Sequence, residues 1–173
     1  MGAGAAVRLS ALGARIVGVS DVRSAAIDLN GLDVPALIDR SGSAGELSGS
    51  HARDTIFDLG VDLLVLGAAS NSVDEVLAAR LRAPLVVEGA NFGLTGAARG
   101  CLHARGVQVI PDILANSSSA AMVALQMASG NRLSHDRLWD QIRSSIQEAV
   151  RSSAHGAART GASLREEWTR ALG

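Results

Sequence analysis

The chain alternates short, mostly apolar runs with longer segments in which apolar residues recur every three or four positions. Runs of four to six residues that are apolar on both faces and rich in β-branched side chains are typical of strands buried in a parallel sheet. Four such runs predict strands, at residues 15–20, 61–66, 85–88 and 107–110. Residues 51–59 fit either a helix or a strand.

Helices are predicted between and after these runs. Gly13 and Gly106 end two of them, because glycine tolerates the left-handed conformation with which helices often close. Ser134 and the Ser163–Glu166 pair are typical helix-capping residues. The predicted helices cover residues 3–12, 34–40, 73–81, 95–105 and 117–129, a segment in which Leu138, Ile142, Ile146 and Ala149 share one face, and a segment in which Leu164, Trp168 and Leu172 share one face. Residues 41–50, rich in Gly and Ser, predict a loop.

This order of elements predicts an α/β fold with a parallel sheet covered by helices on both faces. The strands all lie within residues 1–131, and residues 132–173 are expected to be a helical segment that packs on the same domain. Ligands of such sheets bind at the carboxyl ends of the strands. The candidate site residues therefore follow the strands, at Asp21 and in residues 67–71, 88–91 and 111–116.

Composition narrows the classes of function. The 173 residues carry a net charge of −1, so neither nucleic acid nor an anionic membrane surface is an expected partner. No apolar run approaches the ~20 residues that span a bilayer. The single cysteine, Cys101, excludes an internal disulfide and suits a cytoplasmic protein. The four histidines show no metal-ligand spacing with one another or with Cys101, so no metal site is expected.

Three motifs follow one another along the chain: Gly13–Asp21 continued by Asn30–Asp33, then Glu88–Asn91, then Pro111–Asn116. In order and spacing they resemble the cofactor domain of the glutamate, leucine, phenylalanine and valine dehydrogenases. The resemblance covers roughly residues 2–131. It implies the cofactor-binding part of an NAD(P)-dependent enzyme that converts an L-amino acid to a 2-oxo acid and ammonia.

The same resemblance implies that the chain is truncated at its start. The family's dinucleotide fingerprint is a strand, a glycine-rich turn and a helix, and the last glycine of that turn corresponds to Gly2. The preceding strand, which is central in a doubly wound sheet of order 3-2-1-4-5-6, would lie before Met1. We therefore expect a Rossmann-like sheet without its first strand, so that residues 15–20 and 61–66 lack their common neighbour. Three explanations of this truncation are open: the chain is a fragment, a split subunit with a partner chain, or a degenerate remnant.

The resemblance also implies which residues bind the cofactor at the adenosine end. Gly2 would lie near the pyrophosphate. Asp21 would accept hydrogen bonds from the adenosine ribose and repel a 2′-phosphate, which favours NAD, whereas Arg23 could bind that phosphate and leaves NADP possible. The alternative for Asp21 is a solvated aspartate in a turn.

At the nicotinamide end, Ala68 and Ala69 would let the dinucleotide pass close to the backbone, or would only allow a helix to pack on a strand. Asn91 would contact the nicotinamide ribose, because its amide both donates and accepts hydrogen bonds; the alternative is a turn asparagine. Asn116 would lie near the nicotinamide and the substrate, and could also cap the following helix. Glu88 and Asp112 are expected to be structural.

No catalytic residue is assigned, because the family's acid–base lysine and aspartate lie in a domain that the chain does not contain. The chain has no lysine, and its sixteen arginines are poor bases because arginine stays protonated. Ser117–Ser119 and Val123 depart from the family pattern, so glutamate specificity is not implied. We expect a homo-oligomer or a complex with a chain that supplies the catalytic domain. The alternative function is a noncatalytic dinucleotide-binding module or a split subunit.

Overall fold

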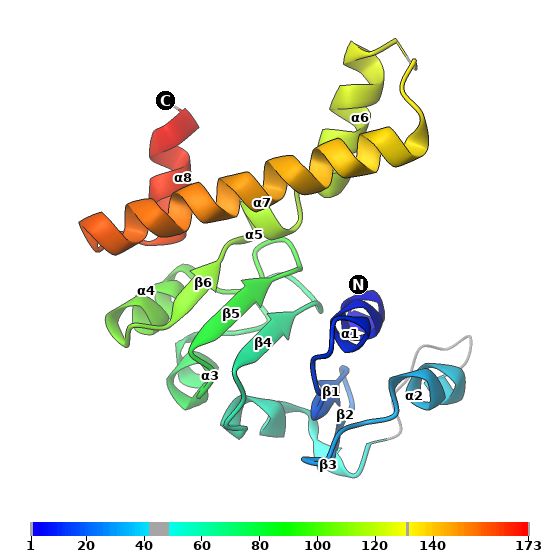
Figure 1. The fold of residues 1–173 in the computed structure, drawn as a ribbon. Coiled ribbons are helices and arrows are strands. Elements are labelled where there is room, and N and C mark those ends of the chain that lie inside the picture. Colours follow the sequence, from blue (N-terminus) through cyan, green and yellow to red (C-terminus); the bar gives the residue numbers. More distant parts are fainter. Residues whose placement is uncertain (1, 42–48, 131, 173) are drawn as a thin grey trace.

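The computed structural model describes residues 2–41, 49–130 and 132–172, so the predicted loop at 41–50 lies mostly outside the described residues. Its elements alternate between strands and helices, as expected from the sequence (Figure 1). In chain order they are α1 (Gly2–Ala11), β1 (Gly18–Ser20), β2 (Ser24–Ile27), α2 (Val34–Ser41), β3 (His51–Ala52), the 3₁₀ helix η1 (Arg53–Asp58), β4 (Leu63–Leu66), α3 (Glu75–Arg80), β5 (Leu85–Glu88), α4 (Gly96–Ala104), β6 (Gln108–Ile110), α5 (Asp112–Ala115), α6 (Ser118–Ala128), α7 (His135–Thr160) and α8 (Leu164–Leu172).

The centre of the fold is a parallel sheet in the order β4-β5-β6. Its register pairs Val65 with Val87 and Val86 with Val109. Val86, Leu94 and Leu102 are fully buried in the main core beside it. The mostly apolar sequence of these strands thus produces a sheet with a well-packed face, and the parallel pairing brings the carboxyl ends of all three strands to one edge.

The first three strands form a separate antiparallel sheet in the order β1-β2-β3. Among the described contacts, residues 15–20 are thus not paired with the parallel sheet, as expected if their common neighbour with residues 61–66 is missing, but their antiparallel pairing with β2 was not expected. Strand β2 was not predicted, because its sequence Ser-Ala-Ala-Ile is weakly β-forming and reaches its pairing through the tight turn after β1. Within the described residues β1 pairs only with β2 and β4 only with β5, so each has one edge without a strand partner.

The C-terminal helices lie together beyond the carboxyl ends of β5 and β6 (Figure 1). The long helix α7 begins at the predicted Ser134 cap and buries Leu138 and Ile142, as its apolar stripe predicts. Helix α7 contacts α5, and α8 contacts β6. The predicted capping box is confirmed, because Ser163 and Glu166 exchange hydrogen bonds at the start of α8. The short helix α5 was not predicted, since four residues show no helical period.

Candidate functional site

Asn91 and Asn116 form a side-chain pair at the carboxyl edge of the parallel sheet. Asn91 lies in the turn after β5, and Asn116 ends α5 after β6. The Asn116 Nδ2 donates to the Asn91 Oδ1 at 2.8 Å, although the two residues are 25 positions apart. Asn116 does not cap the next helix, whose N-cap is Ser117. The ends of the neighbouring strands β5 and β6 thus bring the two side chains together, at the edge where ligands of parallel sheets bind.

The turn after β4 lies against the turn that carries Asn91. Ser70 Oγ donates to the Asn91 carbonyl at 2.7 Å, and the Asn71 N–H donates to the Phe92 carbonyl at 2.6 Å. Ala68 and Ala69 are exposed in the same turn as Ser70. The structure therefore brings Ala68, Ala69, Asn91 and Asn116 to one edge, with small side chains beside the amide pair.

Both turns contain a residue with a left-handed backbone. Asn71 has a φ of 53° and Phe92 a φ of 52°. Asparagine tolerates this region, but for a bulky residue such as Phe92 it is an outlier that costs about 1–3 kcal/mol. Such strain persists only where surrounding contacts determine the backbone, and it is typical of ligand-binding turns.

Glu88 holds the backbone of Leu94, which lies at the far end of the turn that carries Asn91. Its carboxylate is fully buried, and its Oε1 accepts the Leu94 N–H at 3.0 Å and the Arg99 Nη2 at 3.0 Å. Its Oε2 lies 3.3 Å from the Arg165 Nη2. A buried carboxylate is tolerated only with such partners. The expectation that Glu88 is structural agrees with these contacts.

Asp112 fixes the middle of the same turn. Its Oδ2 accepts the Phe92 N–H at 2.7 Å, and its Oδ1 accepts the Ile113 N–H and pairs with Arg165. Burial alone raises the pKa of Asp112, but the Phe92 N–H and the Arg165 guanidinium hold that pKa below its ordinary value. Asp112 is therefore a carboxylate that supports the turn, as expected, rather than a proton carrier.

The roles of Arg99 and Arg165 had not been anticipated. Arg165 is 77 residues from Glu88 and 53 from Asp112, so no local pattern indicates that it contacts either. Arg99 is one turn of helix α4 past its Thr95 cap. For Arg99, the sequence offers one indication of this contact: the arginine lies eleven residues after Glu88, a carboxylate that ends a strand predicted to be buried.

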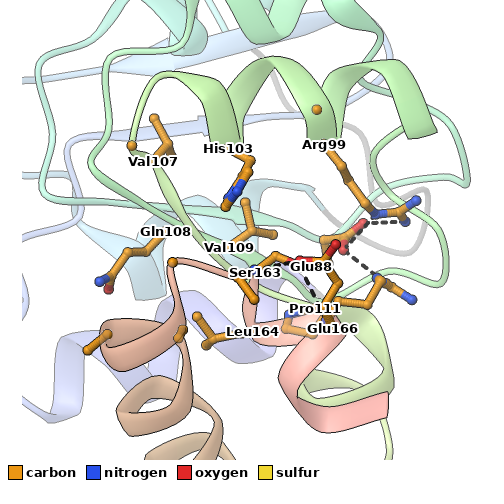
Figure 2. A pocket seen from close by; sticks show the side chains of 17 residues that line it. Glu88, Arg99, His103, Val107, Gln108, Val109, Pro111, Ser163, Leu164 and Glu166 are labelled. Atoms are coloured by element: carbon orange, nitrogen blue, oxygen red, sulfur yellow. Dashed lines mark hydrogen bonds and ion pairs between the residues drawn. The ribbon is translucent and has the colours of Figure 1, made fainter. Parts of the chain in front are cut away.

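A cleft of about 500 Å³ lies on another side of the parallel sheet, between α4, β6 and the turn from α7 to α8. Figure 2 shows His103 pointing into it from α4, with Glu88 at its inner end. Its lining includes Arg99 and Arg165 but neither Asn91 nor Asn116. The cleft is thus separate from the asparagine pair and shares only the supporting charges with it.

Asp21 lies in the turn between β1 and β2. Its Oδ1 accepts the N–H groups of Arg23 at 2.8 Å and Ser24 at 3.0 Å, which is the pattern of a turn-stabilising aspartate. No described hydrogen bond joins this turn to Asn91. Its role toward a ribose stays a prediction.

Gly2 is the first residue of α1, exposed, with nothing within 4 Å of where a side chain would begin. The structure itself therefore does not require glycine there, and a role near a pyrophosphate stays a prediction.

Two further properties bear on the class of site. Within the described ranges, no group of three or more His, Cys, Asp or Glu side chains could hold a metal ion. Among the helices of the same ranges, none is long and apolar enough to span a bilayer.

Comparison with known proteins gives a family match along nearly the whole chain. Residues 1–171 match the family described as Glutamate/Leucine/Phenylalanine/Valine dehydrogenase. Glutamate dehydrogenase B of Halobacterium salinarum is 36% identical over 163 residues, which are 88% of this chain and 38% of that protein. The NAD-specific glutamate dehydrogenase of Staphylococcus aureus is 33% identical over 145 residues, 80% of this chain and 35% of that protein.

A solved structure also shares the fold. The hetero-hexameric glutamate dehydrogenase of Thermus thermophilus, in a leucine-bound form, superposes with a TM-score of 0.82 at 28% identity. The match covers 96% of this chain and 41% of that one. The chain thus spans about two fifths of the length of the proteins that it resembles.

Proposed function

Because the chain belongs to the glutamate/leucine/phenylalanine/valine dehydrogenase family, we propose that it is the cofactor-binding part of an NAD(P)-dependent amino-acid dehydrogenase. The observation that carries the proposal is the hydrogen bond between Asn91 and Asn116 at the carboxyl edge of the sheet. When bound, the cofactor supplies the hydride acceptor. The chain's own residues bind and orient it.

The arrangement at the edge fits the nicotinamide end of a dinucleotide. The bond to Asn116 uses the Asn91 Oδ1, so the Asn91 Nδ2 can donate to a ribose hydroxyl. The Asn116 Oδ1 is not used in that bond and can accept a hydrogen bond from the cofactor or substrate. The exposed Ala68 and Ala69 leave room for the cofactor to pass close to the backbone.

At the other end of the cofactor, Asp21 is the residue that we propose for the adenosine ribose. A carboxylate accepts hydrogen bonds from ribose hydroxyls and repels a 2′-phosphate. Gly2, at the start of α1, is proposed to lie near the pyrophosphate. NAD is favoured, and NADP is possible through Arg23.

The reaction of the whole enzyme needs residues from outside this sequence. We propose oxidative deamination of an L-amino acid to a 2-oxo acid and ammonia. The sequence contains no lysine, so a catalytic lysine would come from another segment or chain, in a cytoplasmic homo-oligomer or complex. Residues 1–131 would form the incomplete dinucleotide-binding domain, on which residues 132–173 pack. Alone, the chain would bind the cofactor without catalysing the reaction.

Titration calorimetry of the chain with NAD⁺ and NADP⁺ tests the proposal. We expect NAD⁺ to bind, and Asn91→Ala to weaken binding about 5–10-fold, which is the loss of one or two hydrogen bonds. Gln147→Ala, at an exposed amide side chain of helix α7, is the control and should leave binding unchanged. Absence of binding by the wild-type chain, or equal effects of the two variants, would contradict the proposal.

A further inference from the structure

The strained backbone at Phe92 needs an explanation, because its side chain does not hold it. The Phe92 side chain is 57% exposed, so packing contributes little. Its backbone is held from both sides: the N–H donates to the Asp112 Oδ2, and the carbonyl accepts the Asn71 N–H. The conformation next to Asn91 therefore depends on the position of the Asp112 carboxylate.

The position of Asp112 depends in turn on the C-terminal helix. Asp112 is almost fully buried, and its cation partner in the described part of the chain is Arg165 of α8. The same Arg165 Nη2 also reaches the Glu88 Oε2, and Glu88 holds the Leu94 N–H at the other end of the turn. One guanidinium thus spans the two carboxylates that fix residues 92 and 94.

We propose that Arg165 is a positioning residue for the asparagine pair, so that docking of helix α8 sets the geometry of the candidate cofactor site. Arg99 cannot replace it, because Arg99 bonds to Glu88 and not to Asp112. A lysine cannot replace it either, because its side chain is one bond shorter, so its ammonium ends short of the position from which the Arg165 Nη2 contacts both carboxylates. As far as it concerns the cofactor, this inference rests on the proposed function.

The arrangement has a consequence for control of the site. Helix α8 starts at Leu164, beside the cleft that His103 faces (Figure 2). A short turn at Gly161 joins α8 to α7. A change that moves α8 away from β6 withdraws Arg165 from both carboxylates. The Asn91 turn then loses the support for its left-handed residue, although no group of the asparagine pair has been altered.

Amide hydrogen exchange followed by NMR tests the inference without any cofactor. In Arg165→Ala we expect the Phe92 and Leu94 amides to exchange at least about 10-fold faster, while the Val87 amide within the sheet keeps its wild-type rate. Arg170→Ala is the matched control, because Arg170 is an exposed arginine of the same helix that pairs only with Glu167 among the described ion pairs. Unchanged exchange at Phe92, or equal acceleration at Phe92 and Val87, would overturn the inference.

Two more variants keep the test decisive. Arg165→Lys keeps the charge and the helix, and it should still accelerate exchange at Phe92 if bridging of both carboxylates is what matters. In a Phe92→Gly background, the effect of Arg165→Ala on NAD⁺ affinity should shrink, because glycine adopts the left-handed conformation without support. An undiminished effect would mean that Arg165 acts only on overall stability.

The inference about Arg165 and the proposed function can be contradicted by different results. If the wild-type chain does not bind NAD⁺, the proposed function is wrong, while the exchange rates still decide whether Arg165 positions the turn. If NAD⁺ binds but the exchange rates of Phe92 and Leu94 ignore Arg165, only the present inference is wrong. With both correct, Arg165→Ala should weaken NAD⁺ binding about 5–10-fold, comparable to the loss of one hydrogen bond.

Discussion

The two halves of the candidate site are built differently. At the edge of β4-β5-β6, the turn with Asn91 is fixed by a neighbouring turn, by two buried carboxylates and by two arginines. In the β1-β2-β3 sheet, Asp21 closes a small hairpin whose described core residue is Ala25. Motifs that resemble the same protein family lie in both halves. Within the described contacts, only at the edge of the parallel sheet do the polar residues of these motifs contact one another, as Asn91 and Asn116 do.

The comparison predicts that the largest effect on stability comes from Glu88. In Glu88→Gln, Arg99 and Arg165 lose a charge partner in a buried place, which costs roughly 3–5 kcal/mol when fully buried. The two arginines are 24% and 27% exposed, so the lower end of that range is expected. Urea unfolding measures it.

Asp21→Asn is the matched change in the other half of the site. Asparagine can still accept the N–H groups of Arg23 and Ser24, and we expect a loss below about 1 kcal/mol. If the two variants were equally destabilised, the proposed difference between the halves would not exist.

A pH series sharpens the comparison through Asp112. The pKa of Asp112 is lower in the folded state than its ordinary value of 3.8. The contribution of the ionised Asp112 to the free energy of unfolding is therefore fully present above the ordinary pKa, and it is lost as the pH falls through the lower pKa of the folded state. The wild-type chain should therefore lose more unfolding free energy between pH 6 and pH 3 than Asp112→Asn does. Parallel curves for the two proteins would contradict this account.

Salt separates this buried group from an exposed one. Arg80 also lowers the pKa of Asp58, but both partners lie at the surface, 41% and 44% exposed. Added salt should reduce the contribution of Asp58 and leave most of that of Asp112, because buried pairs are screened less. Comparison of Asp58→Asn with Asp112→Asn at low and high salt measures the difference.

The smallest effect is expected from the strained turn itself. Phe92→Gly removes a left-handed phenylalanine and should stabilise the chain by about 0.5–1 kcal/mol, after the entropy that glycine adds to the unfolded state. Asn71→Gly is the matched control with the same φ and should gain less, because asparagine tolerates that region. Thermal unfolding of both variants checks the order, and a destabilised Phe92→Gly would count against strain at this position.

The sequence predicts most of the parallel half, because its signals are local. The run at residues 85–88 becomes β5 with the same bounds, and the helix predicted at residues 95–105 becomes α4, Gly96–Ala104. Strand β2 escapes detection because its small residues have little β propensity. Its pairing with β1 is decided by tertiary structure.

The candidate site divides in the same way. Motifs indicate Asn91 and Asn116, and the structure joins them. The support from Arg165 cannot be read from the sequence, because nothing local distinguishes it from the exposed Arg170 five residues later, which pairs with Glu167 of its own helix. Only the folded chain shows which arginine meets a buried carboxylate.

The most direct test of the central claim is an NMR titration of the ¹⁵N-labelled chain with NAD⁺. The account predicts that the signals of Asn91, Phe92 and Asn116 shift together, with those of Ala68 and Ala69, and that Asn91→Ala needs about 5–10-fold more NAD⁺ for the same response. The Gln108 signal, at the separate cleft, should stay unchanged. Shifts confined to that cleft, or no shifts at all, would contradict the claim that the cofactor binds at the carboxyl edge of the parallel sheet.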